Sequence, residues 1–258
     1  MPKDGDSLRT WKGSVLNYIM HGLESGPLLF VLIDPDKQGA KKAGEMAKIA
    51  QKSGAHAIMV GGSTGLTRNT VRNTVIAIKS ECSLPVILFP RSAECLVGEA
   101  DAVFFMSLLN SRNRNKIIGE QVKGAPLVKK LGIEPLPMGY IIVEPGMAVG
   151  EVGEAEVIKR ENVEEAVAYA LAAEYLGMKF VYLEAGSGAP EPVPPDMIKA
   201  VGDAVSIPVI VGGGITTPER AKGALDAGAD IIVVGTAAEK NIDILRSMAS
   251  MTSASVYK

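Results

Sequence analysis

The stretch Pro208-Val-Ile-Val-Gly-Gly-Gly-Ile-Thr-Thr-Pro218-Glu-Arg-Ala221 decides the fold. An apolar strand runs directly into three glycines, Gly212 to Gly214, and a helix follows. Thr217 and Pro218 are typical of the N-cap and of the first helical position. Glycines leave no Cβ where backbone amides would approach a ligand. The stretch therefore predicts a strand, an anion-binding loop and a helix, in that order.

A second strand that ends in glycine follows, in Gly228-Ala-Asp-Ile-Ile-Val-Val-Gly235-Thr236. Barrels of eight parallel strands commonly bind phosphate with the loops after strands seven and eight. Either loop alone could equally be a tight turn. The pair, in these two strand positions, favours a phosphate site.

Short apolar runs alternate with helical patterns along the whole chain. The expected strands are Leu28–Ile33, Ala57–Val60, Val86–Phe89, Ala102–Met106, Gly139–Val143, Phe180–Leu183, Val209–Val211 and Ile231–Val234. The expected helices are Ala40–Lys52, Gly65–Lys79, Val163–Leu176, Pro195–Val205, Pro218–Asp226 and Lys240–Ser250. Regular alternation predicts a parallel sheet, since parallel neighbours need a helical crossover.

Eight repeats in 258 residues predict an α/β protein with a single (β/α)8 TIM barrel, which typically has roughly 250 residues. An open doubly wound sheet is the alternative. We expect one domain over residues 1–258, with residues 1–26 as an N-terminal helical extension that covers one barrel end. The fourth helix region, Ser111 to Pro137, is expected to be irregular because it is interrupted by Gly119, Gly124, Pro126 and Gly132.

Composition limits the partners. The 27 basic and 29 acidic residues are interspersed, which argues against a nucleic-acid surface. Cys82 and Cys95 fit no metal or redox spacing, so a reduced cytoplasmic protein is expected. No apolar run approaches the roughly 18 residues that a transmembrane helix needs. Peripheral contact with a membrane stays open.

The sixth expected strand carries the candidate catalytic groups. Tyr182 and Glu184 are two residues apart and so lie on one side of the strand, at its carboxyl end, where barrels keep catalytic groups. The alternative is that Glu184 is a structural acid paired with a neighbouring Lys or Arg. Gly186 and Gly188 around Ser187 form a further loop that could hold phosphate or hydroxyls.

The first expected strand ends in an acidic motif, Asp34-Pro-Asp36, and the second leads into Gly61-Gly-Ser63-Thr-Gly65. One carboxylate, one hydroxyl and a ligand's phosphate oxygens are usual components of a Mg²⁺ site. Asp34, at the end of the first strand, and a hydroxyl of the Gly61–Gly65 loop are therefore candidate metal ligands. A turn with a helix-capping Asp36 is the alternative.

Taken together, these motifs resemble the geranylgeranylglyceryl phosphate synthase family, which includes the bacterial heptaprenylglyceryl phosphate synthases. The resemblance spans the whole barrel, and Ile33 and the Ala-Gly-Ser-Gly loop look like its larger, mostly archaeal branch. It implies a prenyltransferase that uses Mg²⁺, sn-glycerol 1-phosphate and a prenyl diphosphate in membrane ether-lipid synthesis. It also implies a homo-oligomer.

The resemblance assigns roles to individual residues. Glu184 matches the residue that activates the attacking hydroxyl, helped by Tyr182, and Asp34 and Ser63 match the Mg²⁺ positions. The glycerol phosphate site is matched by Tyr182, Leu183, Glu184, Ala185, Gly186, Ser187, Gly188, Gly213, Gly214, Gly235 and Thr236.

Two further questions stay open on the sequence. A prenyl tail needs an apolar groove, for which the candidates are Phe104, Phe105, Met106, Leu108 and Leu109, although a core stripe is the default interpretation of these residues. The alternative functions are another phosphate-binding barrel enzyme, such as a phosphosugar isomerase or a thiamine-phosphate-synthase-like transferase, or a different prenyl chain length. A non-enzymatic phosphometabolite-binding module would require Glu184 to be dispensable.

Overall fold

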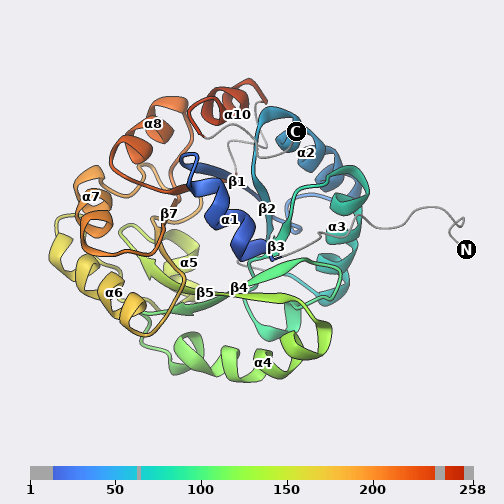
Figure 1. Cartoon of the computed structure of the whole chain (residues 1–258). Coiled ribbons are helices and arrows are strands. Elements are labelled where there is room, and N and C mark those ends of the chain that lie inside the picture. Colours follow the sequence, from blue (N-terminus) through green and yellow to red (C-terminus); the bar gives the residue numbers. More distant parts are fainter. Residues whose placement is uncertain (1–13, 63–64, 236–241, 253–258) are drawn as a thin grey trace, which may run out of the picture.

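The computed structural model describes residues 14–62, 65–235 and 242–252. Eight parallel strands close into a barrel in sequence order, which confirms the predicted fold class (Figure 1). The strands are β1 (Leu28–Ile33), β2 (Ala57–Val60), β3 (Val86–Leu88), β4 (Ala102–Leu108), β5 (Glu134–Ile142), β6 (Phe180–Glu184), β7 (Val209–Gly212) and β8 (Ile231–Val234).

Helices surround the barrel (Figure 1). They are α1 (Val15–Leu23), α2 (Ala40–Ser53), α3 (Arg68–Glu81), α4 (Glu120–Leu131), α5 (Met147–Val152), α6 (Val163–Tyr175), α7 (Pro195–Ala204), α8 (Pro218–Asp226) and α10 (Ile242–Ala249). A short 3₁₀ helix, η1 (Ala93–Cys95), and a π-helical turn, η2 (Asn115–Gly119), complete the described elements. No helix within the described ranges has the length and hydropathy that crossing a bilayer requires.

Strand alternation divides the core into two layers. On β6, Phe180 and Tyr182 belong to the cluster inside the barrel, whereas Val181 and Leu183 pack in the outer cluster under the helices. The same two-residue period holds on the other strands because successive side chains point to opposite faces. Residues that continue an inward-facing row past the end of a strand therefore reach the barrel mouth.

Helix α1 covers the amino-terminal end of the barrel (Figure 1). The Glu134 carboxylate accepts a hydrogen bond from Ser14 Oγ at 2.6 Å, and Tyr18 donates its hydroxyl proton to His56 O at 2.9 Å. His56 is buried, and its Nδ1 accepts from Leu29 N at 3.1 Å. Helix α1 thus lies across the barrel end opposite the mouth, where His56 is buried, and residues 1–13 of the predicted extension lie outside the described residues.

The expected interruption of the fourth helix is wrong in its main part. Helix α4 runs unbroken through Gly124 and Pro126 and stops only at Gly132, which has φ +70°. Gly124 is buried, and a Cβ there would lie 3.4 Å from Leu96 Cδ1. A Cβ would make only an ordinary contact at this position, and the glycine does not break the helix. The irregularity is confined to η2, which precedes α4.

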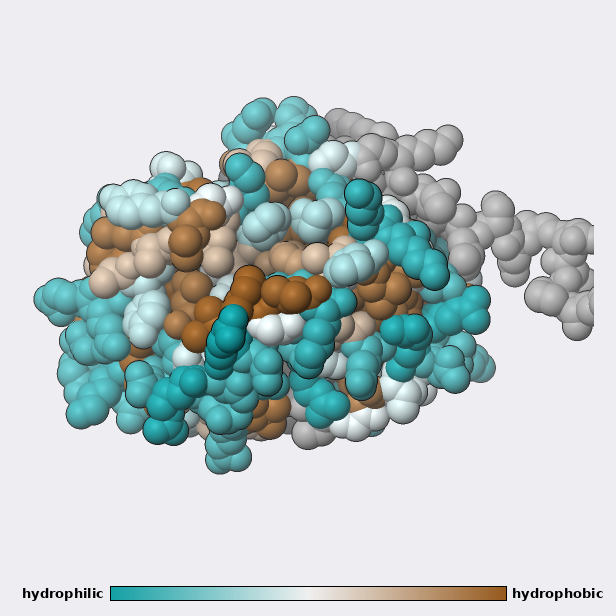
Figure 2. Space-filling model, turned by 90° about the horizontal axis from the view of Figure 1, so that it is seen from below, coloured by the Kyte–Doolittle hydropathy of each residue, from teal (hydrophilic) through white to brown (hydrophobic). Residues whose placement is uncertain are grey.

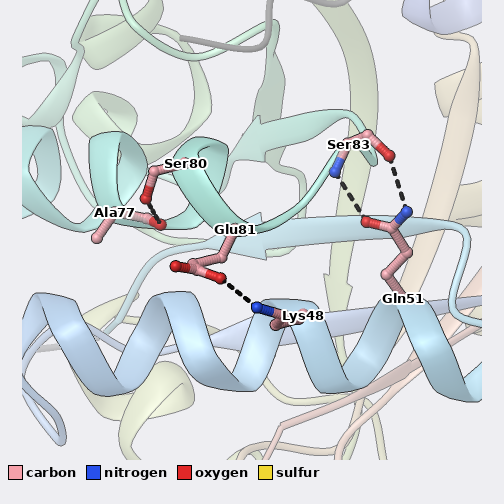
Figure 3. Close-up of polar contacts among 6 residues, drawn as sticks. All are labelled: Lys48, Gln51, Ala77, Ser80, Glu81 and Ser83. Carbon is pink, nitrogen blue, oxygen red and sulfur yellow. Dashed lines mark hydrogen bonds and ion pairs between the residues drawn. The ribbon is translucent and has the colours of Figure 1, made fainter. Parts of the chain in front are cut away.

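Helices α2 and α3 pack side by side through polar and ionic contacts (Figure 3). Lys48 Nζ lies 2.7 Å from Glu81 Oε2, and the Gln51 amide both donates to Ser83 Oγ and accepts from Ser83 N. These side chains lie at the surface or close to it, whereas Lys79 and Asp101 form an ion pair with side-chain exposures of 4% and 7%. The second Asp101 oxygen accepts from Val86 N at 2.9 Å, which ties α3 to the barrel.

Loss of the buried ion pair Lys79–Asp101 and loss of the exposed pair Lys48–Glu81 should lower the free energy of unfolding by different amounts. Lys79→Met leaves the Asp101 carboxylate buried without its cation and should lower the free energy of unfolding by about 3–5 kcal/mol. The matched change Lys48→Met removes a solvent-exposed pair and should cost about 0–1 kcal/mol. Urea titration of both variants measures the difference, and equal losses would contradict this assignment.

Candidate active site

A cavity of about 410 Å³ occupies the carboxyl-terminal mouth of the barrel and extends toward α4. Asp34, Glu184, Ser187 and Gly235 line its polar part, so these four predicted residues come together although they are far apart in sequence. The cavity therefore lies where the strand ends of a (β/α)8 barrel place its chemistry.

Glu184 is the buried carboxylate of the mouth, with 7% of its surface exposed. Its Oε1 accepts from Gly186 N at 2.7 Å, and its Oε2 accepts from the Tyr140 hydroxyl at 3.2 Å. Burial raises the pKa of Glu184 above its usual range, and the hydrogen bonds from Gly186, Tyr182 and Tyr140 offset part of that rise. No Lys or Arg is among these partners. The raised pKa makes this carboxylate a stronger proton acceptor than an exposed glutamate.

Three aromatic rings form the floor beneath Glu184. The Tyr140 and Tyr182 rings meet edge to face at 5.1 Å between centroids, and Phe89 stacks on Tyr182 at 5.8 Å. Sequence reasoning missed Tyr140 and Phe89. The available signal was the two-residue period, because Tyr140 faces inward on β5 and pairs in register with Tyr182.

The glycines after β7 make room for protein atoms as well as for a ligand. A Cβ at Gly212 would lie 2.0 Å from the Tyr182 hydroxyl, and one at Gly213 would lie 2.5 Å from Glu184 Oε1. A Cβ at Gly214 would meet the backbone of Glu191 at 2.5 Å. The loop is therefore glycine-rich because the Tyr182–Glu184 pair occupies the adjoining space.

Helix α8 begins beside this loop as predicted. The Thr217 side chain accepts from Arg220 N, and Pro218 is the first helical residue. The Arg220 guanidinium donates to Gly214 O at 3.0 Å and to Thr216 Oγ1 at 3.1 Å. Arg220 of α8 thus fixes the loop between β7 and α8.

Other predicted site residues lie differently. The side chains of Leu183 and Ala185 pack in the outer layer, and Ala185 N donates to Gly212 O while Ala185 O accepts from Gly146 N. Gly186 gives its amide to Glu184, and Gly188 is exposed with φ +81°. Leu183 and Ala185 are therefore positioned to support the site from behind. Ser63 and Thr236 lie outside the described residues.

Asp34 lines the cavity at the end of β1, and its side chain is 16% exposed. Burial raises the pKa of Asp34, while the amide of Asp36, at 3.0 Å from Oδ1, and the charge of Lys37 lower it. Within the described ranges, no three His, Cys, Asp or Glu side chains converge as a metal cage would require. One carboxylate at the end of β1 instead fits Mg²⁺, which keeps water and substrate oxygens as ligands.

Toward α4 the cavity wall is mostly apolar. Phe104, Phe105, Met106 and Leu108 line it together with Leu96 and Gly124, and Lys116, Glu120 and Gln121 add polar groups on the same side. Leu109 does not line it and packs against the outer layer instead. The contribution of α4 was missed because nothing in its sequence marks the helix as a cavity wall.

A closed barrel with a buried carboxylate at its mouth and glycine loops beside it defines a (β/α)8-barrel enzyme. The chain belongs to the PcrB family, whose pattern matches residues 25–252.

A curated relative from Pyrococcus horikoshii, named geranylgeranylglyceryl phosphate synthase, is 56% identical over 88% of this chain and 90% of its own length. The crystal structure of (S)-3-O-geranylgeranylglyceryl phosphate synthase from Thermoplasma acidophilum, in complex with the substrate sn-glycerol-1-phosphate, superposes with a TM-score of 0.91. That protein is 41% identical, with 94% of this chain and 99% of the other covered. The thiamine phosphate pyrophosphorylase from Pyrococcus furiosus, 17% identical with a TM-score of 0.59 over 92% of this chain and 97% of that one, shares the fold alone.

Proposed function

We propose that this chain is a geranylgeranylglyceryl phosphate synthase. It transfers the prenyl group of geranylgeranyl diphosphate to the 3-hydroxyl of sn-glycerol 1-phosphate and forms an ether bond. The observation that carries the proposal is Glu184, a buried carboxylate without a cationic partner among its hydrogen bonds, which faces a cavity that is polar at the mouth and apolar beyond. The high identity to relatives of that name supports it.

The glycerol phosphate is assigned to the loops after β6, β7 and β8. Glu184, Ser187 and Gly235 line the cavity and would face the substrate, whereas Tyr182 is buried and holds Glu184. Gly213 and Gly214 lead to the amino-terminal end of α8. Backbone amides and a helix N-terminus favour a phosphate dianion. Held in this way, the substrate would present one hydroxyl to Glu184.

In the proposed reaction, C1 of the prenyl chain exchanges its bond to the diphosphate for a bond to the glycerol. The bond between C1 of the prenyl chain and the diphosphate oxygen breaks, and a bond from C1 to the glycerol 3-oxygen forms. The diphosphate leaves with the bonding electron pair, and the hydroxyl proton passes to Glu184 Oε1 or Oε2. Tyr140 and Tyr182 hold the carboxylate, so the proton acceptor keeps its position as its charge changes.

Asp34 is assigned to Mg²⁺, together with Ser63, which the resemblance pairs with it. When bound, Mg²⁺ neutralises charge that builds on the leaving diphosphate. Asp34 directly follows β1, which pairs with β8 in the closed barrel, and its side chain lines the same cavity as Glu184. Two anionic groups would then lie within one mouth, as a transfer between two phosphorylated substrates requires.

The apolar part of the cavity favours prenyl transfer over the other barrel reactions. Phosphosugars and thiamine precursors are small and polar. They would not bury apolar surface against Phe104, Phe105 and Leu108. A prenyl chain would bury its carbons there. Chain lengths other than geranylgeranyl are distinguished by assay.

The direct test is ether formation from sn-glycerol 1-phosphate, Mg²⁺ and a panel of prenyl diphosphates. The wild-type chain should give product, with geranylgeranyl diphosphate preferred, and Glu184→Ala should lower kcat/KM by about 10²–10⁴-fold because the general base is lost. The matched control is Glu134→Ala, which removes a carboxylate at the opposite barrel end. No product with any chain length would refute the function, and near-normal turnover of Glu184→Ala would refute the base.

The metal assignment is tested by titrating Mg²⁺ at fixed substrate concentrations. Asp34→Asn keeps the size of the side chain but removes the charge, so we expect the half-saturating Mg²⁺ concentration to rise at least about tenfold. Asp36→Asn, two residues away on an exposed side chain, is the control. An unchanged Mg²⁺ curve in Asp34→Asn would show that another group holds the ion.

A further inference from the structure

One arginine joins two of the loops beside the barrel mouth. Arg160 lies between α5 and α6, and its Nη2 is 3.2 Å from Glu191 Oε2, in the loop after β6. Its Nη1 donates to Glu144 O, in the loop after β5, at 3.4 Å. A planar guanidinium can hold two acceptors in a fixed geometry, which a lysine ammonium does less well. We call this set of three residues the Arg160 bridge.

The backbone of the Arg160 bridge is attached to the barrel. Val143 and Ile158 form an isolated parallel bridge directly after β5. Within it, Ile158 N donates to Ile142 O at 3.0 Å, and Glu144 N donates to Ile158 O at 2.8 Å. Ile158 is buried. Because Arg160 follows Ile158 by two residues, the strand end fixes the place from which its side chain reaches Glu191.

The other end of the Arg160 bridge contacts the glycine loop after β7. A Cβ at Gly214 would lie 2.5 Å from the backbone of Glu191, so the two backbones pack directly on each other. A Cβ at Gly186 would likewise lie 2.6 Å from Gly146 O, in the loop after β5. The loop after β6 is therefore packed between its two neighbours, and any shift of Glu191 acts on Gly214.

The loop after β6 needs such an outside contact. Gly186 has φ +100° and Gly188 has φ +81°, and glycine adopts these conformations and many others at similar cost. Local preference therefore does not fix the course of the loop. Ser187, between the two glycines, lines the cavity. An ion pair three residues beyond Gly188 restricts the loop without occupying the site.

We propose that Arg160 is a positioning residue for bound glycerol phosphate. Through Glu191 it sets the spacing between the loop after β6 and the glycine loop after β7, and this spacing determines how the two loops fit the phosphate. This role rests on the function proposed above, which assigns the phosphate to these loops. Neither Arg160 nor Glu191 lines the cavity, so both act on the substrate through other residues.

The second substrate provides an internal comparison. The prenyl chain is assigned to the cavity wall toward α4, where Phe104, Phe105 and Leu108 lie. Figure 2 views the molecule from the α4 side and shows apolar surface in the middle with hydrophilic residues around it. The Arg160 bridge belongs instead to the loops after β5 and β6. Its loss should therefore weaken the binding of glycerol phosphate and leave that of the prenyl diphosphate unchanged.

Steady-state kinetics with both substrates test this role. Arg160→Gln should raise the KM for sn-glycerol 1-phosphate about threefold to tenfold, the range for loss of a surface ion pair and one hydrogen bond. The kcat and the KM for geranylgeranyl diphosphate should change by less than about twofold. Arg160→Lys should restore part of the loss. The matched control is Lys199→Gln, which removes an exposed ion pair with Asp203 on α7 and should change none of these values.

A double-mutant cycle tests the route through Glu191. Glu191→Gln should raise the same KM, and Arg160→Gln/Glu191→Gln should raise it no further than the larger single change, because both remove one interaction. Independent effects that multiply would contradict this route. An unchanged KM for sn-glycerol 1-phosphate in Arg160→Gln, or an equal rise in both KM values, overturns the positioning role.

Hydrogen exchange of the unliganded protein separates this role from the proposed function. Arg160→Gln should speed amide exchange in residues 186–191 and 213–216 at least about threefold and leave that of β4 unchanged. If the wild type forms no ether product but exchange responds in this way, prenyl transfer is refuted and the Arg160 bridge is supported. Unchanged exchange in both segments refutes the bridge, whatever the activity.

Discussion

The burial of one carboxylate, Glu184, is the constraint on which the rest of the mouth depends. A charged group removed from water needs hydrogen bonds, and Glu184 obtains them from the Gly186 amide and from two tyrosines. The space taken by Tyr182 and Glu184 is the space that side chains at Gly212 and Gly213 would fill. One acidic side chain therefore explains the turn after β6, the inward tyrosine on β5 and the glycines after β7.

The same constraint connects the chemistry with the shape of the cavity. The aromatic floor of Phe89, Tyr140 and Tyr182 separates the polar mouth from the packed barrel interior. From the mouth the cavity extends sideways toward α4, where most of its lining side chains are apolar. A buried carboxylate next to a largely apolar cavity wall suits a reaction that joins a polar alcohol to a hydrocarbon chain.

The barrel was predictable because its signals are local and periodic. Strand–helix alternation identified all eight strands, and the position of Tyr182 and Glu184 at one strand end correctly placed them on the inner side. The path of α4 was not predictable, because Gly124 and Pro126 are typical helix breakers and yet lie inside an unbroken helix. Tyr140 was missed because its role depends on a hydrogen bond to Glu184, which lies 44 residues away in the sequence.

The most direct measurement of the central claim is the pH dependence of kcat/KM for ether formation. The proton acceptor must be ionised, so activity should rise with pH through the pKa of Glu184, with an inflection above the usual glutamate value of 4.5. Tyr140→Phe removes a hydrogen bond that favours the carboxylate and should move the inflection to higher pH. Tyr18→Phe, whose hydroxyl bonds His56 O at the other barrel end, should leave it in place. An inflection that ignores Tyr140→Phe would contradict the assignment of Glu184 as the base.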